Sequence, residues 1–388
     1  MKYKAAILGY YGFGNLGDEL LLTACLEMFG RCGVGREGVI VLSNAPDETS
    51  RVFGVASVNR WRLREVVRAL RESESLLLGG GGIFQDSTSV KSCVWYWGVV
   101  RLARLFGCRV WALGQSVGPL RCGVSRVVAG NALRGCRVLH VRGESSREVA
   151  ESLGCKNVIT GSDLVMTLRE DSLSPAHTHI REDARDADGC SNPVTASDLV
   201  MPLCGKSSEC SSPAHTHIRG EDSRDAVGCS NPVTSSDAMP PKPQAQHSEG
   251  KYTLLNLRPC ENLPGYVRIL TPHLQGKNVI GAALSDEDTD ALTPLNLPEI
   301  VRVKTFRDAR NLWAGASEAV GMRLHFGVLS RIFSTPLALM PYDVKVREFA
   351  AQSGVPCIVD EWAEPVAPLA VPECSSEIDG ICREILAL

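Results

Sequence analysis

The sequence lacks the features that define several common classes of protein. No apolar run reaches the roughly 18 residues that a membrane-spanning helix needs. The formal net charge is only −3, so the chain has no large basic excess of the kind that attracts nucleic acid. The first residues, MKYKAAILGYYGFG, contain no signal-peptide cleavage pattern. We therefore expect a cytoplasmic protein that does not bind nucleic acid.

No Cys-x-x-Cys motif occurs, although the chain has 15 cysteines. The cysteines are scattered, and a reducing compartment would keep most of them as free thiols that pack like small apolar residues. We therefore predict neither a disulfide framework nor a structural metal site.

With 388 residues, the chain has room for two or three domains. Its first part alternates short apolar segments with amphipathic ones. Strands are predicted at 4–9, 39–42, 76–78, 109–113 and 138–142, and helices at 18–29, 62–72, 92–106 and 145–153. Strict alternation of this kind is typical of an α/β fold with a parallel, doubly wound sheet. The first domain is predicted to cover residues 1–168.

A tandem duplication follows at about 169–250. The segment SPAHTHIREDARDADGCSNPVT recurs as SPAHTHIRGEDSRDAVGCSNPVT, and SDLVM at 162–166 recurs at 197–201. These units are polar and almost free of aromatic residues, so they cannot bury enough apolar surface to offset the entropy of ordering. We predict a long, mostly disordered insertion. Its paired histidines, such as His177 and His179, resemble metal ligands, but duplication alone explains their repetition.

Strand-like segments resume after the insertion, at 252–259, 278–282, 299–303, 317–322, 337–340 and 358–360. They predict a second domain over residues 251–375 with the same parallel architecture. A last helix at 376–388 is expected to pack back on the first domain.

The segment GYYGFGNLGDE (9–19) turns glycine-rich directly after the first strand. Gly12, Gly14 and Gly17 fit the G-x-G-x-x-G spacing of a dinucleotide-binding loop, which stays open as an alternative. No acidic residue ends a second strand, however, as that fold requires. Asn15, Asp18 and Glu19 lie where a phosphate would approach. The two carboxylates would repel a phosphate, and the three side chains suit the hydroxyl groups of a sugar better.

Two further glycine turns follow predicted strands. LLLGGGGIFQDSTS (76–89) and WALGQSVGPL (111–120) each break from a strand into a turn, and VRGES (141–145) brings an arginine to the same edge. The carboxyl ends of parallel strands meet at one edge of a sheet, where open α/β sheets bind ligands. We therefore predict a cleft lined by Gly14, Gly80, Gly81, Gln85 and Gln115 together with the three polar residues above.

The segment SEAVGMRLHFGVLSRIFSTPLALMPYDVKVR (317–347) brings cationic groups to the corresponding edge of the second sheet. Arg323 and His325 follow one strand and Lys345 follows the next, while Arg258 ends an earlier strand and is a weaker candidate. Arg and Lys at such an edge suit an anionic substrate. His325 is the histidine placed to donate a proton, and we predict it as the general acid.

Six of these segments occur in the order found in polysaccharide pyruvyl transferases, and the chain resembles that family, most closely the CsaB-type bacterial enzymes. The resemblance implies a GT-B-like fold, in which two Rossmann-like domains face a cleft. It also implies transfer of a pyruvyl group from phosphoenolpyruvate, a co-substrate, to a sugar, with release of phosphate and no cofactor. The family's donor-site residues would fall on Arg142, His325 and Lys345, with Arg323 beside them.

For CsaB-type members, the resemblance implies a lipid-linked acceptor containing N-acetylmannosamine, a precursor of the secondary cell-wall polymer that anchors surface-layer proteins. Peripheral contact with the inner face of the membrane through this acceptor, and a homo-oligomer, are left open. One departure concerns the family's usual Val-Arg-Asp, which reads Val141-Arg142-Gly143 here. Glu144 is a candidate replacement for the missing carboxylate. The insertion between the domains is a second departure.

Two alternative functions fit the same fold. The first is a glycosyltransferase that uses a nucleotide sugar. The second is a catalytically silent binding module, disabled by the insertion or by the missing carboxylate at Gly143.

Overall fold

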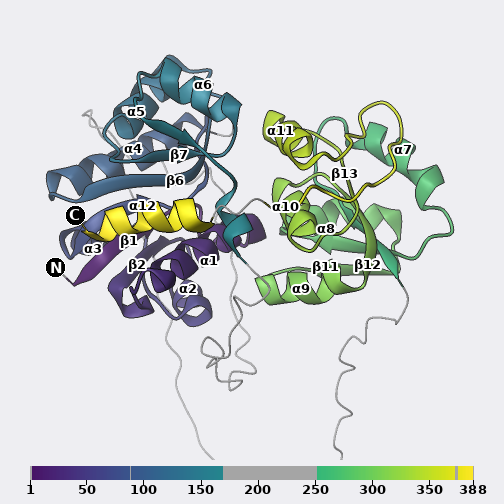
Figure 1. Cartoon of the computed structure of the whole chain (residues 1–388), viewed down its shortest axis with the longest axis horizontal. Helices are drawn as coiled ribbons and strands as arrows, with labels where there is room; N and C mark the ends of the chain where they lie inside the picture. The colour runs from purple at the N-terminus through teal and green to yellow at the C-terminus, as the bar shows by residue number, and fades with distance from the viewer. Residues whose placement is uncertain (1, 88, 169–250, 372–374, 388) are drawn as a thin grey trace, which may run out of the picture. The chain divides into compact units, whose positions relative to one another are not determined.

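The computed structural model describes residues 2–87, 89–168, 251–371 and 375–387 (Figure 1). The predicted insertion at 169–250, with its repeats and histidine pairs, lies outside the described residues. Both sheets described below belong to one compact unit of the chain.

The first sheet contains eight strands, and all their pairings are parallel. The strands are β1 (Tyr3–Leu8), β2 (Val39–Ser43), β3 (Ala56–Asn59), β4 (Ser73–Leu78), β5 (Gly81–Phe84), β6 (Arg109–Val117), β7 (Leu139–Val141) and β8 (Val158–Thr160). Their order is β3-β2-β1-β4-β6-β7-β8, and β5 pairs with β6. The predicted parallel, doubly wound architecture is confirmed.

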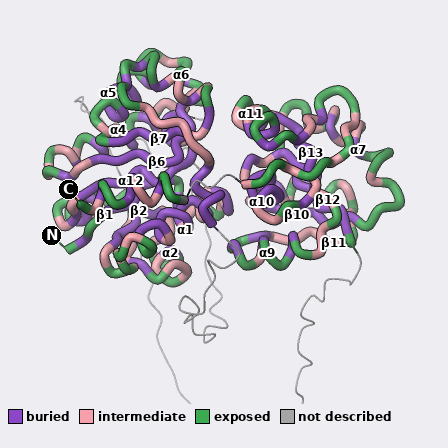
Figure 2. The backbone as a smooth tube through the Cα atoms, in the orientation of Figure 1, coloured by how far each residue is buried: buried purple, intermediate pink, exposed green. Residues whose placement is uncertain are grey.

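Helices cover both faces of this sheet. They are α1 (Leu16–Arg31), α2 (Pro46–Phe53), α3 (Leu63–Arg71), α4 (Val90–Leu105), α5 (Gly123–Leu133) and α6 (Glu144–Ser152). Alternate residues of β1 enter different apolar clusters, Ile7 with α1 and Leu8 with the cluster of α3, α4 and α5. Strands covered on both faces are apolar throughout, which explains the continuous run AAIL. Figure 2 shows these strands buried between helices with exposed outer sides.

The second sheet has five parallel strands in the order β11-β10-β9-β12-β13. They are β9 (Tyr252–Asn256), β10 (Val279–Ala283), β11 (Glu299–Arg302), β12 (Ala316–Gly321) and β13 (Leu337–Leu339). The accompanying helices are α7 (Leu263–Leu274), α8 (Asp286–Leu292), α9 (Phe306–Ala314), α10 (Leu324–Ile332) and α11 (Val344–Ser353).

The strand predicted at 358–360 is wrong. This segment makes only an isolated bridge from Leu339 to Cys357 and then bends. Ile358 is fully buried, so its apolar character reflects packing and not a paired strand.

The last helix, α12 (Ser375–Ala387), packs against α1 of the first sheet. Ile378 and Cys382 are buried there, and the guanidinium of Arg31 donates to Asp379 at 2.8 Å.

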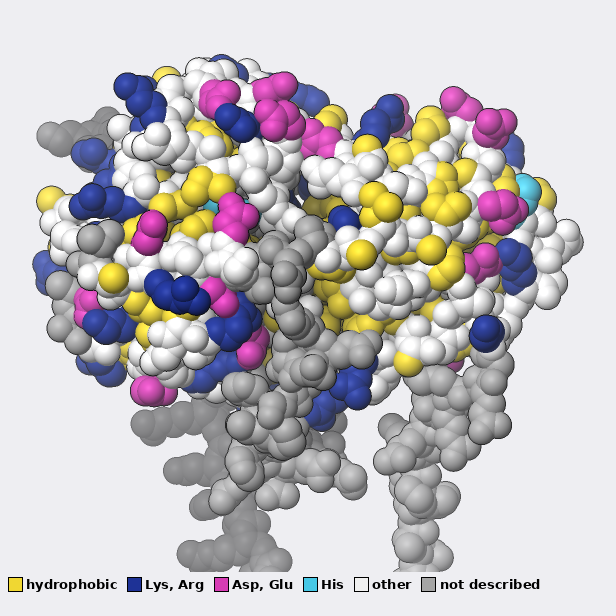
Figure 3. Space-filling view, viewed as in Figure 1, with side chains coloured by type: hydrophobic (Ala, Val, Ile, Leu, Met, Phe, Trp, Pro, Cys, Tyr) yellow, Lys and Arg dark blue, Asp and Glu magenta, His cyan; other side chains and the backbone are white. Residues whose placement is uncertain are grey.

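Among the described residues, no helix has the length and apolarity that crossing a bilayer requires. Cationic, anionic and apolar side chains are interspersed over the face shown in Figure 3.

In each sheet, successive strands of the chain are added first on one side of the earliest strand and then on its other side. The change of side falls between β1 and β4 in the first sheet and between β9 and β12 in the second. The loops after neighbouring strands diverge at such a point and leave a crevice where α/β proteins bind ligands. The two crevices supply the residues of the site described next.

Candidate active site

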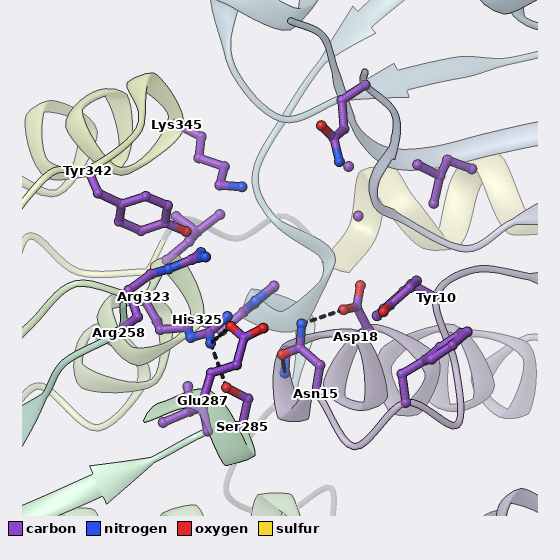
Figure 4. A pocket seen from close by; sticks show the side chains of 18 of the residues that line it. Tyr10, Asn15, Asp18, Arg258, Ser285, Glu287, Arg323, His325, Tyr342 and Lys345 are labelled. Carbon is purple, nitrogen blue, oxygen red and sulfur yellow. Dashed lines mark hydrogen bonds and ion pairs between the residues drawn. The ribbon is translucent and has the colours of Figure 1, made fainter. Parts of the chain in front are cut away.

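A cavity of about 560 Å³ is lined by residues that follow strands of both sheets. Among the residues predicted for the site, it brings together nine: Asn15, Asp18, Gly81, Gln85, Arg142, Arg258, Arg323, His325 and Lys345. In Figure 4, Arg258, Arg323, His325, Tyr342 and Lys345 lie on one side, and Tyr10, Asn15 and Asp18 on the other. The cavity therefore has a cationic half and a half that carries hydroxyl-binding and aromatic groups.

His325 is the second residue of α10, and Arg323 precedes that helix as its N-cap. The imidazole packs against the first turn of α1, where a Cβ added to Gly17 would lie 2.1 Å from Nδ1. Its Nε2 lies 3.4 Å from Arg142 Nη1 and 3.6 Å from a carboxylate oxygen of Asp163. Neutral Nε2 can accept from the arginine, and protonated Nε2 faces the carboxylate.

Asp163 is a residue that the sequence interpretation missed. Its carboxylate is buried, forms an ion pair with Arg142 and accepts from the backbone N–H of Val165 at 3.0 Å. Burial alone would raise the pKa of Asp163, but Arg142 and His325 outweigh burial and hold this pKa well below its usual value. The available signal was its place just after β8, at the edge where Arg142 follows β7.

Arg142 and Arg323 are both held by buried carboxylates. Arg142 Nε donates to Ser116 at 2.7 Å, in addition to the ion pair with Asp163. Arg323 makes a bidentate pair with Asp288, with Nη2 to Oδ1 at 2.6 Å and Nε to Oδ2 at 3.1 Å. Burial alone would lower the pKa of Arg323, but the effect of Asp288 is larger, and the pKa is raised overall. These arginines are therefore fixed in position, with their charges largely balanced.

Arg258 and Lys345 are the less balanced cations. The Arg258 guanidinium lies 4.3 Å from the ring centroid of Tyr342, and its buried Nε has no hydrogen-bond partner. Within the described ranges, no carboxylate forms an ion pair with Arg258. Lys345 Nζ lies 3.3 Å from Asp343, and both side chains are about one-third exposed. An anionic ligand would find an unpaired guanidinium at Arg258 and a partly exposed, singly paired ammonium at Lys345.

The opposite half of the cavity is built by the loop between β1 and α1. Asn15 caps α1, because its Oδ1 accepts from Gly17 N at 3.2 Å, and its Nδ2 donates to Asp18 at 2.7 Å. Burial raises the pKa of Asp18, and the neighbouring His325 and Arg142 oppose that rise. The rings of Tyr10 and Phe13 also line the cavity and stack at 4.0 Å.

Four predicted cleft residues do not line the cavity. The carbonyl of Gly14 accepts from Arg302, whereas Gly80 is buried against Leu21. Glu19 turns away and accepts from Gly12 N at 2.8 Å, and burial raises its pKa to about 7. Gln115 is fully buried and donates to two backbone carbonyls, because β6 extends past its predicted end and includes this residue.

The carboxylate beside Gly143 comes from Glu348 of α11 and not from Glu144. The Glu144 side chain is 65% exposed and lies near Arg147. Glu348 Oε1 accepts from Ser145 N at 3.0 Å, in the first turn of α6. Its Oε2 would lie only 2.7 Å from a Cβ at Gly143, where φ is +119°. The absence of a side chain at Gly143 therefore leaves room for the carboxylate of Glu348, which comes from α11 beside the second sheet.

In the part of the chain that the structure describes, no group of three or more His, Cys, Asp and Glu side chains could hold a metal ion. The chemistry that the site can perform with its own groups is binding of an anion, donation of a proton from His325 and binding of hydroxyl groups by Asn15 and Asp18.

Comparisons with known proteins bear on both the fold and the family. The family model for polysaccharide pyruvyl transferase matches residues 15–344. No curated protein matches the chain in sequence. The UDP-GlcNAc 2-epimerase from Methanocaldococcus jannaschii is similar in structure, with a TM-score of 0.54, 10% identity and coverage of 99% of each chain. A putative UDP-N-acetylglucosamine 2-epimerase from Listeria monocytogenes has a TM-score of 0.50 and 8% identity, with coverage of 100% of this chain and 88% of that one. These likenesses show a GT-B-like fold of two parallel-sheet domains.

Proposed function

The chain belongs to the polysaccharide pyruvyl transferase family, and on this premise we propose that it transfers a pyruvyl group from phosphoenolpyruvate to two hydroxyls of one sugar. The product is a cyclic ketal, and inorganic phosphate is released. The observation that carries the proposal is the placement of His325 between a cationic wall and a hydroxyl-binding wall of a single cavity.

The donor binds at the cationic wall. Phosphoenolpyruvate carries a carboxylate and a phosphate, and Arg258 and Lys345 supply the cations that are least balanced by protein carboxylates. Arg142 and Arg323 are held rigidly by Asp163 and Asp288, so they can orient the donor without a change of rotamer.

His325 acts as the general acid. It protonates the methylene carbon of the donor, which leaves positive charge at the carbon that bears the phosphate. One sugar hydroxyl attacks this carbon and loses its proton. The C–O bond to phosphate then breaks, phosphate leaves with the bonding electrons, and positive charge returns to the carbon. The second hydroxyl attacks the same carbon and gives up its proton, to the imidazole or to the phosphate, which closes the ketal. The carboxylate of Asp163 lies 3.6 Å from Nε2 and places negative charge beside the imidazole that donates the proton.

The acceptor binds at the opposite wall. Asp18 and Asn15 provide hydrogen-bonding groups for sugar hydroxyls, and burial makes the Asp18 carboxylate a better proton acceptor by raising its pKa. Tyr10 and Phe13 add a flat apolar surface to this wall, which suits the C–H face of a pyranose ring. We take the acceptor to be N-acetylmannosamine in a lipid-linked precursor of a cell-wall polymer, used at the cytoplasmic side of the membrane.

Donor binding and chemistry can be tested separately. Phosphoenolpyruvate alone is expected to raise the melting temperature of the wild-type protein, and the His325→Ala variant is expected to keep this shift while phosphate release is lost. Stabilisation by UDP-sugars without any response to phosphoenolpyruvate would instead indicate a glycosyltransferase. Donor binding without phosphate release from the wild type, in the presence of a competent acceptor, would indicate a silent module.

A further inference from the structure

The outward sides of α3, α4 and α5 form one continuous surface on the first sheet. The inner sides of these helices share a single apolar cluster, which includes Val66, Val100 and Ala129. Helix α4 contacts both α3 and α5, so their outer sides adjoin. We call this outer area, with the loop residue Trp61, the α3–α5 surface.

Large apolar side chains are exposed on the α3–α5 surface. Leu105 is 75% exposed and Val127 is 69% exposed, and the others are Trp61, Leu63, Val94 and Val124. Val94, Arg101 and Leu105 follow one another at helical spacing, so α4 presents mixed apolar and basic groups along one side. Exposed apolar groups concentrated on one surface are typical of an interaction site.

The same surface carries an excess of positive charge. Between Asp86 and Glu144 the sequence contains nine Lys and Arg residues and no Asp or Glu. Two of the nine lie elsewhere, since Arg142 pairs with Asp163 in the cavity and Arg109 of β6 pairs with Glu74. Lys91, Arg101 and Arg126 of α4 and α5 are exposed. Helix α3 contributes exposed Arg64 and Arg71, whereas Glu65 and Glu72 pair with Arg62 and Arg68.

We propose that the α3–α5 surface docks on an anionic lipid bilayer. Exposed apolar side chains would enter the headgroup region while lysines and arginines pair with lipid phosphates, the combination that peripheral membrane proteins use. Nucleic acid fits less well, because aliphatic groups such as Leu105 and Val127 would find no partner on a phosphate backbone.

The surface also adjoins the cavity. Ser92 and Tyr96, in the first half of α4, line the cavity wall, and Lys91 and Val94 are exposed on the same part of the helix. If the proposed function holds, a lipid-linked sugar could occupy the cavity while its lipid stays in the bilayer below α4. Docking itself does not depend on that function.

Sedimentation with vesicles tests the proposal. The wild-type protein is expected to pellet with vesicles of phosphatidylglycerol and phosphatidylcholine, and not with phosphatidylcholine alone. The variant Lys91→Gln/Arg101→Gln/Arg126→Gln should bind on the order of 100-fold more weakly, since each cation near an anionic membrane contributes roughly fivefold. The matched control Arg268→Gln/Arg307→Gln/Arg310→Gln removes the same charge from exposed positions of α7 and α9 and should bind like the wild type.

A second variant, Leu105→Gln/Val127→Gln, tests the apolar contribution and should also reduce pelleting, with an unchanged melting temperature. The proposal would be overturned if both triple variants lost vesicle binding to the same extent. It would also be overturned if Lys91→Gln/Arg101→Gln/Arg126→Gln bound vesicles as tightly as the wild type. Failure to pellet with anionic vesicles, together with salt-sensitive binding of RNA or DNA through the same residues, would also overturn it. Vesicle binding and phosphate release are separate readouts, so failure of one is distinguishable from failure of the other.

Discussion

Substituting alanine for Gly17 tests whether the position of His325 determines the rate. A Cβ at this position would lie 2.1 Å from His325 Nδ1, whereas ordinary contact begins at 3.4 Å. The imidazole would therefore have to move by about 1.3 Å. Misplacing a catalytic group by about 1 Å costs on the order of 100-fold in rate. We expect kcat of Gly17→Ala to fall by about that factor.

The assay is phosphate release at saturating phosphoenolpyruvate and acceptor, with the donor-induced shift in melting temperature measured beside it. The backbone of Gly17 is helical and not left-handed, so alanine is compatible with the local conformation. Gly30→Ala is the matched control in the same helix, because a Cβ there meets nothing within 4 Å. It should retain wild-type activity.

If Gly17→Ala is folded and keeps kcat within twofold of the wild type, the geometry assigned to His325 is not the one that sets the rate. If donor binding disappears together with kcat, His325 holds the donor, and its assignment as the general acid is wrong.

Three further predictions concern other charged residues. Arg258→Gln should raise KM for phosphoenolpyruvate by about 10- to 100-fold, since it removes a charge-assisted contact of about 1.5–3 kcal/mol, and exposed Arg268→Gln should leave KM unchanged. Glu19→Gln should leave stability unchanged at pH 4 and raise it at pH 8, by up to about 3 kcal/mol in denaturant melts. The reason is that burial raises the folded-state pKa of Glu19 from 4.5 to about 7, so the wild type loses stability as pH rises through that window. If the unfolding free energies of Glu19→Gln and the wild type differ by the same amount at pH 4 and pH 8, this reasoning is contradicted. Glu348→Ala should cost about 1 kcal/mol of unfolding free energy by leaving the first turn of α6 uncapped, and Glu348→Gln should restore most of it, which thermal melts can check.

The sequence was sufficient to predict the architecture and nine of the residues that line the cavity. Strands that are apolar throughout and alternate with helices, several of them after a glycine turn, indicate parallel sheets, and the carboxyl ends of parallel strands necessarily share one edge. His325 and Lys345 could be placed from this reasoning alone. Both line the cavity.

The direction of individual side chains was the first feature that the sequence could not predict. Glu19 follows Asp18 directly, and neighbouring residues on a helix point about 100° apart, so only one of the two reaches the cavity. Gln115 was predicted to lie in a turn, but β6 continues to Val117 and keeps it in the sheet. Strand length depends on pairing with neighbours, which a local pattern does not contain.

Contacts between segments that are distant in the sequence were the second feature that could not be predicted. The pairs Arg142–Asp163 and Arg323–Asp288 join residues that are 21 and 35 positions apart in the sequence. Strand β8, which precedes Asp163, is only three residues long. A strand so short leaves little periodicity to detect. Glu348 reaches Ser145 across about 200 residues of sequence, which no local motif could indicate.

The central claim is tested most directly by measuring phosphate release from phosphoenolpyruvate with and without a lipid-linked N-acetylmannosamine acceptor, and by following the acceptor by mass spectrometry. We predict release of phosphate that depends on the acceptor, one ketal-linked pyruvyl group per acceptor, and loss of both in His325→Ala. Phosphate release that is independent of the acceptor, or an acceptor that remains unmodified by the folded wild-type protein, would contradict the claim.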